Sequence, residues 1–203
     1  MPKKVDLKKR HEDLARAAVL AISKNGLTDV TLATVAKEFG WSIGALTHYI
    51  KSKDELLMMA AEYSGRDLMQ RVQQVRQKYK GIEAMRNAMY LALPCNEQIP
   101  GLHNIWFGFW DRSKKNAEVR AMIQERYDDS RKRCAEYVKE AQALGELPAN
   151  VDVAKFARNA VILLEGMNVQ FFTSNKPPSK RAQRQHVDDW ITQLQLLYPM
   201  KKS

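Results

Sequence analysis

Apolar side chains recur every three or four residues along almost the whole chain, and this spacing limits the fold more than any other feature. Leu32, Val35, Ala36 and Phe39 show the pattern clearly. Because an α-helix has about 3.6 residues per turn, residues with this spacing share one face that can be buried. No stretch shows the apolar-polar alternation of a half-buried strand. The sequence therefore predicts an all-α protein.

Capping and breaking residues divide this pattern into separate helices. Thr31, Ser42 and Ser52 each stand just before an apolar helical run, where a hydroxyl can accept a backbone N–H. Glu55 follows Ser52 by three residues, which is the spacing of a capping box. Gly26 is expected to end the first helix. Further along the chain we expect helices at residues 117–144, 153–173 and 180–197.

The net charge of the chain indicates which kind of molecule it binds. The 203 residues include 33 Lys and Arg against 23 Asp and Glu, for a net charge of +10. Half of this excess falls in residues 1–53, which hold 10 basic and 5 acidic side chains. Such a balance favours a polyanionic partner such as nucleic acid. The basic residues at the start of the chain either form a solvated terminus or contact phosphate: Lys3, Lys4, Lys8, Lys9 and Arg10.

Patterns typical of catalysis, secretion and membrane insertion are missing from the sequence. The four histidines are scattered, and we find no metal-ligand spacing, catalytic triad, P-loop or dinucleotide fingerprint. Cys95 and Cys134 are the only cysteines, which favours a reducing compartment. We find no signal peptide and no apolar run of about 18 residues. We therefore expect a cytoplasmic protein that is not an enzyme and uses no metal or cofactor.

The stretch "TLATVAKEFGWSIGALTHYIKSKDEL", from Thr31 to Leu56, has the layout of a helix-turn-helix. Its first helix has an apolar inner face, and Gly40 supplies a turn residue that tolerates positive φ. Small residues open the second helix, where bulky ones would block entry into a DNA groove. Gly44 costs about 1 kcal/mol relative to Ala inside a helix, and close approach to DNA is a reason to keep it. The alternative is a plain three-helix packing unit whose glycines are caps.

DNA contacts follow from the expected position of each side chain in this motif. Hydroxyl and ammonium groups near helix starts suit phosphate oxygens, which accept hydrogen bonds. Side chains in the first half of the second helix lie nearest the base edges. The expected phosphate contacts are Thr31, Ser42, Thr47, Tyr49 and Lys53. The expected base contacts are Ile43, Gly44, Ala45 and His48.

The same stretch resembles the signature of the TetR family of bacterial transcription repressors, "T-x-x-x-I-A-x-x-A-G-V-S-x-G-x-L-Y-x-Y-F-x-S-K-x-x-L". The resemblance implies an N-terminal three-helix helix-turn-helix DNA-binding domain, residues 1–55. It also implies a larger C-terminal helical ligand-binding and dimerisation domain, residues 56–203. The matching positions, with Val35 in place of Ile, are Thr31, Val35, Ala36, Gly40, Ser42, Gly44, Leu46, Tyr49, Ser52, Lys53 and Leu56.

Three positions depart from this signature. Trp41 replaces the small aliphatic residue of the turn and is either a core plug or a lid against the DNA backbone. Thr47 replaces the usual Tyr, which weakens the case for one phosphate hydrogen bond. Ile50 replaces the usual Phe as an ordinary core exchange.

The C-terminal half resembles the BetI-like branch of this family. "WFGFW", residues 106–110, is similar to the branch's "W-L-A-F-W", and residues 145–172 are similar to "G-E-L-x-x-x-x-D-x-x-x-x-A-x-x-L-x-A-L-x-D-G-L". The resemblance implies a small-molecule effector inside each C-terminal domain and a homodimer formed through the last two helices. The expected effector contacts are Trp106, Phe109, Trp110, Tyr127, Glu165 and Asn168. The expected dimer contacts are Leu163, Met167, Phe171, Trp190, Ile191 and Leu194.

Glu165 stands in an apolar helix, where an unpaired carboxylate would be costly. It can pair with Arg158 or another arginine, with a residue across a dimer interface, or with a cationic ligand. A carboxylate near Trp and Tyr would suit a quaternary ammonium through cation–π contact. The aromatic residues of the effector set are otherwise ordinary core residues.

These features together predict a homodimeric repressor that binds a palindromic operator in double-stranded DNA and is released by a small-molecule effector. The operator is expected to be palindromic because two reading helices about 34 Å apart on a two-fold axis meet two equivalent half-sites. The alternative is a helical small-molecule-binding or scaffold protein without sequence-specific DNA binding. An activator would show the same sequence features as a repressor.

Overall fold

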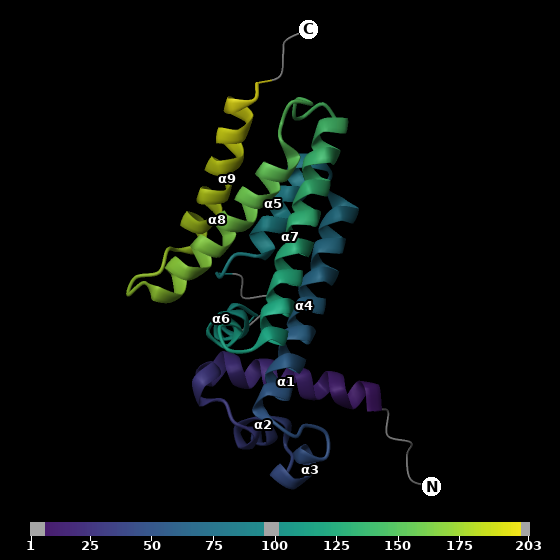
Figure 1. The fold of residues 1–203 in the computed structure, drawn as a ribbon, viewed down its shortest axis with the longest axis vertical. Helices are drawn as coiled ribbons and strands as arrows, with labels where there is room; N and C mark the ends of the chain where they lie inside the picture. The colour runs from purple at the N-terminus through teal and green to yellow at the C-terminus, as the bar shows by residue number, and fades with distance from the viewer. Residues whose placement is uncertain (1–6, 96–101, 200–203) are drawn as a thin grey trace. The chain divides into compact units, whose positions relative to one another are not determined.

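The computed structural model describes residues 7–95 and 102–199, and over these ranges the chain is helical and contains no strand (Figure 1). The predicted all-α class is confirmed. Lys3 and Lys4 lie outside the described residues, as does the side chain of Lys8. The helices are α1 (Leu7–Asp29), α2 (Leu32–Phe39), α3 (Ile43–Thr47), α4 (Lys53–Lys78), α5 (Gly81–Leu91), α6 (Leu102–Ser113), α7 (Ala117–Ala143), α8 (Val153–Thr173) and α9 (Lys180–Leu197).

The chain divides into two compact units. The first combines Met1–Asp67 with Gln98–Asn116, and the second combines Leu68–Glu97 with Ala117–Ser203. Helix α4 begins in the first unit and ends in the second. The predicted domain boundary between residues 55 and 56 falls near the start of this continuous helix, and it stays a prediction.

In the first unit, α1 packs against both α2 and α6. Its inner face is fully buried at Leu14, Ala18 and Ile22, as the periodicity predicts. Gly26 has a φ of 75° and leaves the helical conformation, but the helix resumes and continues to Asp29. The prediction that the first helix ends at Gly26 is therefore confirmed, since the non-helical φ and ψ of this glycine interrupt the helix and only a short helical segment follows it.

A glycine in α6 allows this helix to lie close to α1. A Cβ atom added to Gly108 would meet Cδ2 of Leu27 at 1.5 Å, so only glycine fits against the present position of that leucine. Helix α6 also contacts the start of α4 through an ion pair between Arg112 and Asp54, whose N–O distance is 2.5 Å. The "WFGFW" segment is therefore part of the same unit as the helix-turn-helix.

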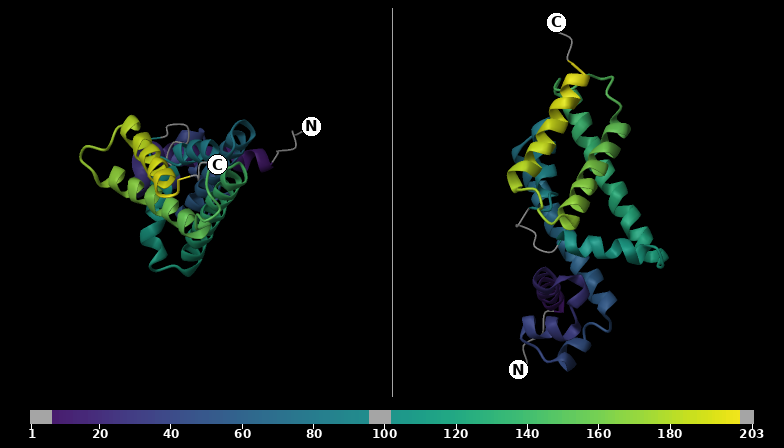
Figure 2. Two further views of the ribbon diagram at one scale, coloured as in Figure 1. Left: turned by 90° about the horizontal axis from the view of Figure 1, so that it is seen from above. Right: turned by 90° about the vertical axis from the view of Figure 1, so that its left-hand side faces the viewer.

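The second unit contains α5, α7, α8, α9 and the later part of α4. Helix α7 packs against α5 and α8, and α5 packs against α9. The colours in Figure 2 show that α7, α8 and α9 run in alternating directions, each antiparallel to the one before it. The inward faces of these three helices and of α5, with the residues just after α5, form one apolar core, which includes Met85, Leu93, Tyr137, Val138, Phe156 and Ile191.

The first residues of α5 receive their caps from distant acidic side chains. Lys80 at the cap position offers no side-chain hydrogen bond. Instead, the Gly81 N–H donates to Oε2 of Glu140 over 3.0 Å, and the Ile82 N–H donates to Oε2 of Glu146 over 2.7 Å. Free N–H groups at a helix start favour such negative partners. The carboxylates thus fix the start of α5 against the end of α7 and the turn after it.

Two weakly acidic groups of the second unit have raised pKa values. Burial, followed by the hydrogen bond that the Tyr90 hydroxyl donates to Asp188 over 2.6 Å, raises the pKa of Tyr90 to about 12. Burial raises the pKa of the Cys134 thiol to about 11. Both groups keep their protons more firmly in the folded protein than in water.

Among the residues that the structure describes, no helix is both long enough and apolar enough to cross a membrane.

Candidate nucleic-acid interface

Helix α2 is closed at both ends by local hydrogen bonds. Oγ1 of Thr31 accepts the N–H of Thr34 over 3.1 Å, and Oγ1 of Thr34 accepts the N–H of Thr31 over 2.8 Å. At the other end Gly40 adopts φ 75° and ψ 28°, and its N–H donates to the carbonyl of Lys37 over 3.2 Å. The predicted roles of Thr31 as a cap and of Gly40 as the left-handed turn residue are confirmed.

Helix α3 buries one face and exposes the other. Leu46 and Ile50 are fully buried beneath it. Oγ of Ser42 accepts the N–H of Ala45 over 3.2 Å and so fixes the first turn. Ile43, at the start of the helix, remains 52% exposed. The other exposed residues of this segment are Ser42, Gly44, Thr47 and His48, while Ala45 and Tyr49 are partly buried.

Gly44 is not required by the packing of the protein. Its φ is not in the left-handed region, and an added Cβ would meet only Oγ of Ser42, at an ordinary contact distance of 4.0 Å. Since alanine would favour the helix by about 1 kcal/mol, the protein alone gives no reason for glycine at this position.

The start of α4 carries the predicted capping box in a slightly extended form. Oγ of Ser52 accepts the N–H of Glu55 over 3.1 Å. The Glu55 carboxylate accepts the N–H of Lys51 over 2.7 Å, one residue earlier than the capping-box pattern predicts. Lys53, the first residue of α4, is partly buried. Thr47 is exposed, but its hydroxyl donates to the carbonyl of Gly44 over 3.0 Å, a bond that a phosphate would have to replace.

Trp41 forms part of an aromatic row between α2 and the end of α3. Its ring centroid lies 4.4 Å from that of Phe39 and 5.1 Å from that of Tyr49. The ring is neither fully buried nor fully exposed. It therefore packs against the helix-turn-helix while one part of it still meets solvent.

The aromatic residues expected at the effector site fall into different units. Trp106, Phe109 and Trp110 lie on α6 in the first unit, whereas Tyr127 lies on α7 in the second. Phe109 is only 1% exposed and belongs to the core of its unit. Trp106 and Trp110 are partly buried, with the Trp106 centroid 6.1 Å from that of Phe109.

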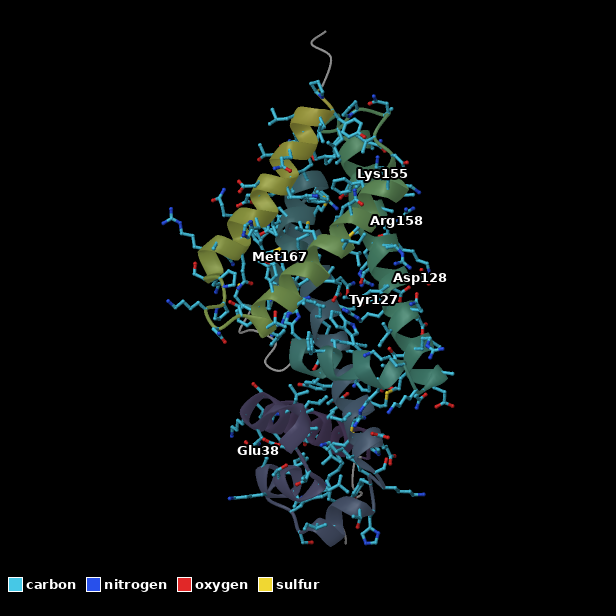
Figure 3. The ribbon with its side chains drawn as sticks, turned by 60° about the vertical axis from the view of Figure 1, so that its left-hand side comes forward. Glu38, Tyr127, Asp128, Lys155, Arg158 and Met167 are labelled. Atoms are coloured by element: carbon cyan, nitrogen blue, oxygen red, sulfur yellow. The ribbon has the colours of Figure 1, made fainter. Side chains whose placement is uncertain are left out.

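In the second unit, the expected effector residues gather where α7 lies against α8. Oε1 of Glu165 lies 2.6 Å from Nη2 of Arg126, and both side chains are mostly buried. The guanidinium of Arg126 also lies 5.1 Å from the ring of Tyr127, which is labelled in Figure 3. The partner of Glu165 is thus an arginine of α7 and not Arg158, which is exposed. Sequence reasoning missed Arg126 because nothing local distinguishes it from the other arginines of α7.

Asn168 lies one turn after Glu165 on α8 and is only 8% exposed. Its side-chain oxygen is buried and accepts no hydrogen bond from the residues that the structure describes. A buried amide oxygen without a donor is costly, and it marks a position where a donor can be accommodated.

The expected dimer residues differ in their surroundings within the chain. Ile191 and Leu194 are buried in the core of the second unit. Leu163, Met167 and Trp190 are partly buried at the edge of this core, and Phe171 is also partly exposed. The exposed apolar side chains on the same two helices are instead Ile162, Leu196 and Leu197. Ile191 and Leu194 therefore pack α9 against the core of the second unit, where other residues of the same chain already cover them.

Comparison with known proteins gives consistent matches. Residues 82–196 match a family described as the BetI-type transcriptional repressor, C-terminal. The HTH-type transcriptional regulator PksA of Bacillus subtilis (strain 168) is 25% identical over 193 residues, which cover 93% of each chain. The HTH-type transcriptional regulator BetI of Stenotrophomonas maltophilia (strain R551-3) is 33% identical over 132 residues, covering 63% of this chain and 66% of its own. These relatives are regulators and not enzymes, as predicted.

Solved structures share the fold. A transcriptional regulator from Saccharomonospora viridis in complex with choline superimposes with a TM-score of 0.80 at 22% identity, covering 91% of this chain and 96% of its own. A TetR-family regulator from Rhodococcus sp. gives a TM-score of 0.74 at 18% identity, covering 92% of this chain and 98% of its own.

Proposed function

The chain belongs to the TetR family of transcriptional regulators and has a BetI-type C-terminal region, and from this membership we propose how it works. It acts as a homodimeric repressor, binds a palindromic operator through its helix-turn-helix, and is released by a small-molecule effector. The family match supports the coarser statement that the protein is a DNA-binding repressor. The operator symmetry, the dimer and the effector are the proposal.

The exposed face of α3 carries the proposal for DNA reading. Leu46 and Ile50 are buried and hold the helix against the protein, while Ile43 and Gly44 are exposed at the start of the helix. The first residues of a reading helix are those that reach base edges in the major groove. Gly44 has open space above it in the protein, which suits close approach by a DNA strand.

The apolar residues of α8 and α9 support a dimer. Ile162 is 62% exposed, and Leu196 and Leu197 are exposed at the end of α9. An isologous pairing of α8 and α9 would cover them together with the half-buried Met167 and Trp190.

The group around Glu165 supports an effector contact in the second unit. Asn168 offers a buried oxygen without a donor, and Tyr127 adds an aromatic face. Arg126 already compensates the Glu165 charge, so a cationic ligand would have to displace this arginine. Because one structural relative was solved with choline, choline is a reasonable first compound to test. The predicted effector contacts on α6, which belongs to the first unit, remain a separate proposal.

The first test uses Gly44→Ala, which should change folding and DNA binding in opposite directions. We expect the free energy of unfolding to stay the same or rise by up to about 1 kcal/mol, because alanine favours a helix. We expect weaker binding to a duplex taken from the DNA upstream of the gene, measured by fluorescence anisotropy. Unchanged binding would argue against close DNA contact at Gly44.

The second test uses Lys53→Ala on the same duplex. Loss of one phosphate contact should weaken binding to all sequences and lower the slope of log K against log salt by about one. Arg66→Ala is the control, since Arg66 also lies on α4 but is exposed and near Glu62. If no duplex binds even at low salt, the scaffold or ligand-binding alternative is favoured.

A rise in melting temperature with choline or another metabolite would identify an effector by mass action.

A further inference from the structure

We propose that Trp41 is a positioning residue for DNA binding: its ring holds the guanidinium of Arg10 beside the start of α3, where Arg10 binds a backbone phosphate. The inference rests on the proposed DNA-binding function and adds a residue outside the helix-turn-helix to it. The guanidinium carbon of Arg10 lies 5.0 Å from the centroid of the Trp41 ring, within the range of a cation–π contact.

The surroundings of Trp41 hold its ring in place. Phe39 packs edge-on to this ring and Tyr49 lies tilted against it. The backbone N–H of Trp41 donates to the carbonyl of Ala36 over 2.8 Å, which fixes the residue to the end of α2. A ring packed against two aromatic neighbours has little freedom to move, so a cation held against it loses little further freedom when it binds a ligand.

Helix α1 reaches this platform with two consecutive side chains. Arg10 lies over Trp41, and the ring of His11 lies edge-on to Tyr49 with 6.1 Å between centroids. Trp41 directly precedes Ser42, the exposed cap of α3. The two contacts therefore connect α1 to residues on either side of the short reading helix, and the Arg10 charge lies over the residue that precedes the cap of this helix.

The chemistry of arginine makes this arrangement suited to phosphate. Stacking on an aromatic ring uses the flat face of the guanidinium and leaves the N–H groups at its edge able to donate. Arg10 forms no ion pair with a carboxylate among the residues that the structure describes, and it is partly exposed. The planar donor edge of a guanidinium matches the paired oxygens of a phosphate. A lysine would lack both the flat face and the paired donors.

The test is a double-mutant cycle measured by fluorescence anisotropy on the duplex that the wild-type protein binds, over a range of salt concentrations. Arg10→Ala should weaken binding about fivefold and lower the salt slope by about one, as for loss of one phosphate contact. Trp41→Leu should cause a similar loss in the wild-type background but less than about a twofold further loss in the Arg10→Ala background. Trp41→Phe, which keeps an aromatic face, should bind within about twofold of the wild type.

Controls separate this role from a structural one. Arg16→Ala removes the same charge from an exposed position on α1 away from the aromatic row, and it should leave the salt slope unchanged. Arg10→Lys keeps the charge but loses the planar donor fork, so it should retain the salt slope and bind with an affinity between those of the wild type and Arg10→Ala. If Trp41→Leu distorts the helix-turn-helix, it will weaken binding equally in both backgrounds, and the proposal is overturned. The proposal is also overturned if Arg10→Ala has no effect on binding while Lys53→Ala weakens it. A wild-type protein that binds no duplex would instead overturn the proposed function.

Discussion

Hydrogen bonds in the helix-turn-helix span short stretches of chain, whereas those that organise the second unit span long ones. Thr31 bonds to Thr34, three residues away. Tyr90 bonds to Asp188, which is 98 residues away. The proposed DNA-reading segment therefore keeps its shape largely through its own sequence, and the second unit keeps its shape through pairs of distant residues. A single substitution should consequently do more damage in the second unit than in the helix-turn-helix.

The largest effect is expected from breaking the ion pair between α7 and α8. Arg126→Ala or Glu165→Ala should lower the free energy of unfolding by about 3 kcal/mol, because each leaves a mostly buried charge without its main partner. The double variant Arg126→Leu, Glu165→Leu should recover most of this loss, since no buried charge then remains. Urea denaturation measures both effects. Single variants that cost less than about 1 kcal/mol would contradict the contrast between the two regions.

A matched pair of glycine substitutions compares the regions directly. A Cβ at Gly81 would meet Oε2 of Glu146 at 2.0 Å, and the residue has a φ of 52°. Gly81→Ala should therefore lower the free energy of unfolding by about 2 kcal/mol, from backbone strain and displacement of the capping carboxylate. Gly44→Ala is the control in the helix-turn-helix and should cause no loss. Thermal and urea denaturation of both variants would show whether the order holds.

Alkaline pH should weaken the second unit through Cys134. Its thiol has a pKa of about 11 in the folded protein, above the value of about 8.5 for a free cysteine. Below pH 8.5 both states are protonated and the contribution is fully present. Between about pH 8.5 and 11 the unfolded chain loses its proton first, so stability falls by an amount on the order of 3 kcal/mol.

Cys134→Ala isolates this contribution. Urea denaturation at several pH values should show a shallower alkaline decline in the variant than in the wild type. Tyr90 acts in the same direction at still higher pH, because its pKa is also raised. Identical pH profiles for the variant and the wild type would show that Cys134 is not the group responsible.

The smallest effects are expected from the local caps. Thr31→Ala and Ser42→Ala should each lower the free energy of unfolding by about 1 kcal/mol, the usual cost of losing a helix cap. Because the two caps close different helices and share no partner, the double variant should show the sum of the two losses within about 0.5 kcal/mol. A much larger combined loss would mean that the helix-turn-helix is not built from independent local parts.

The same contrast explains what could be predicted from the sequence. The caps at Thr31 and Ser42 were predicted because their partners always lie a fixed few residues ahead. The arginine that pairs with Glu165 could not be identified, since several arginines on neighbouring helices were equally suitable. The burial of Ile191 and Leu194 within their own chain could not be predicted for a related reason. An apolar stripe on a helix looks the same whether its own chain or a second copy covers it.

The acidic caps of α5 have a consequence for the order in which the protein is made. The N–H groups of Gly81 and Ile82 find their acceptors 59 and 64 residues later in the chain. Because synthesis proceeds from the N-terminus, α5 leaves the ribosome well before Glu140 and Glu146 do. Its first turn therefore has only water as a partner until the end of α7 and the following turn have emerged. The start of α5 is completed late, even though it lies in the first half of the sequence.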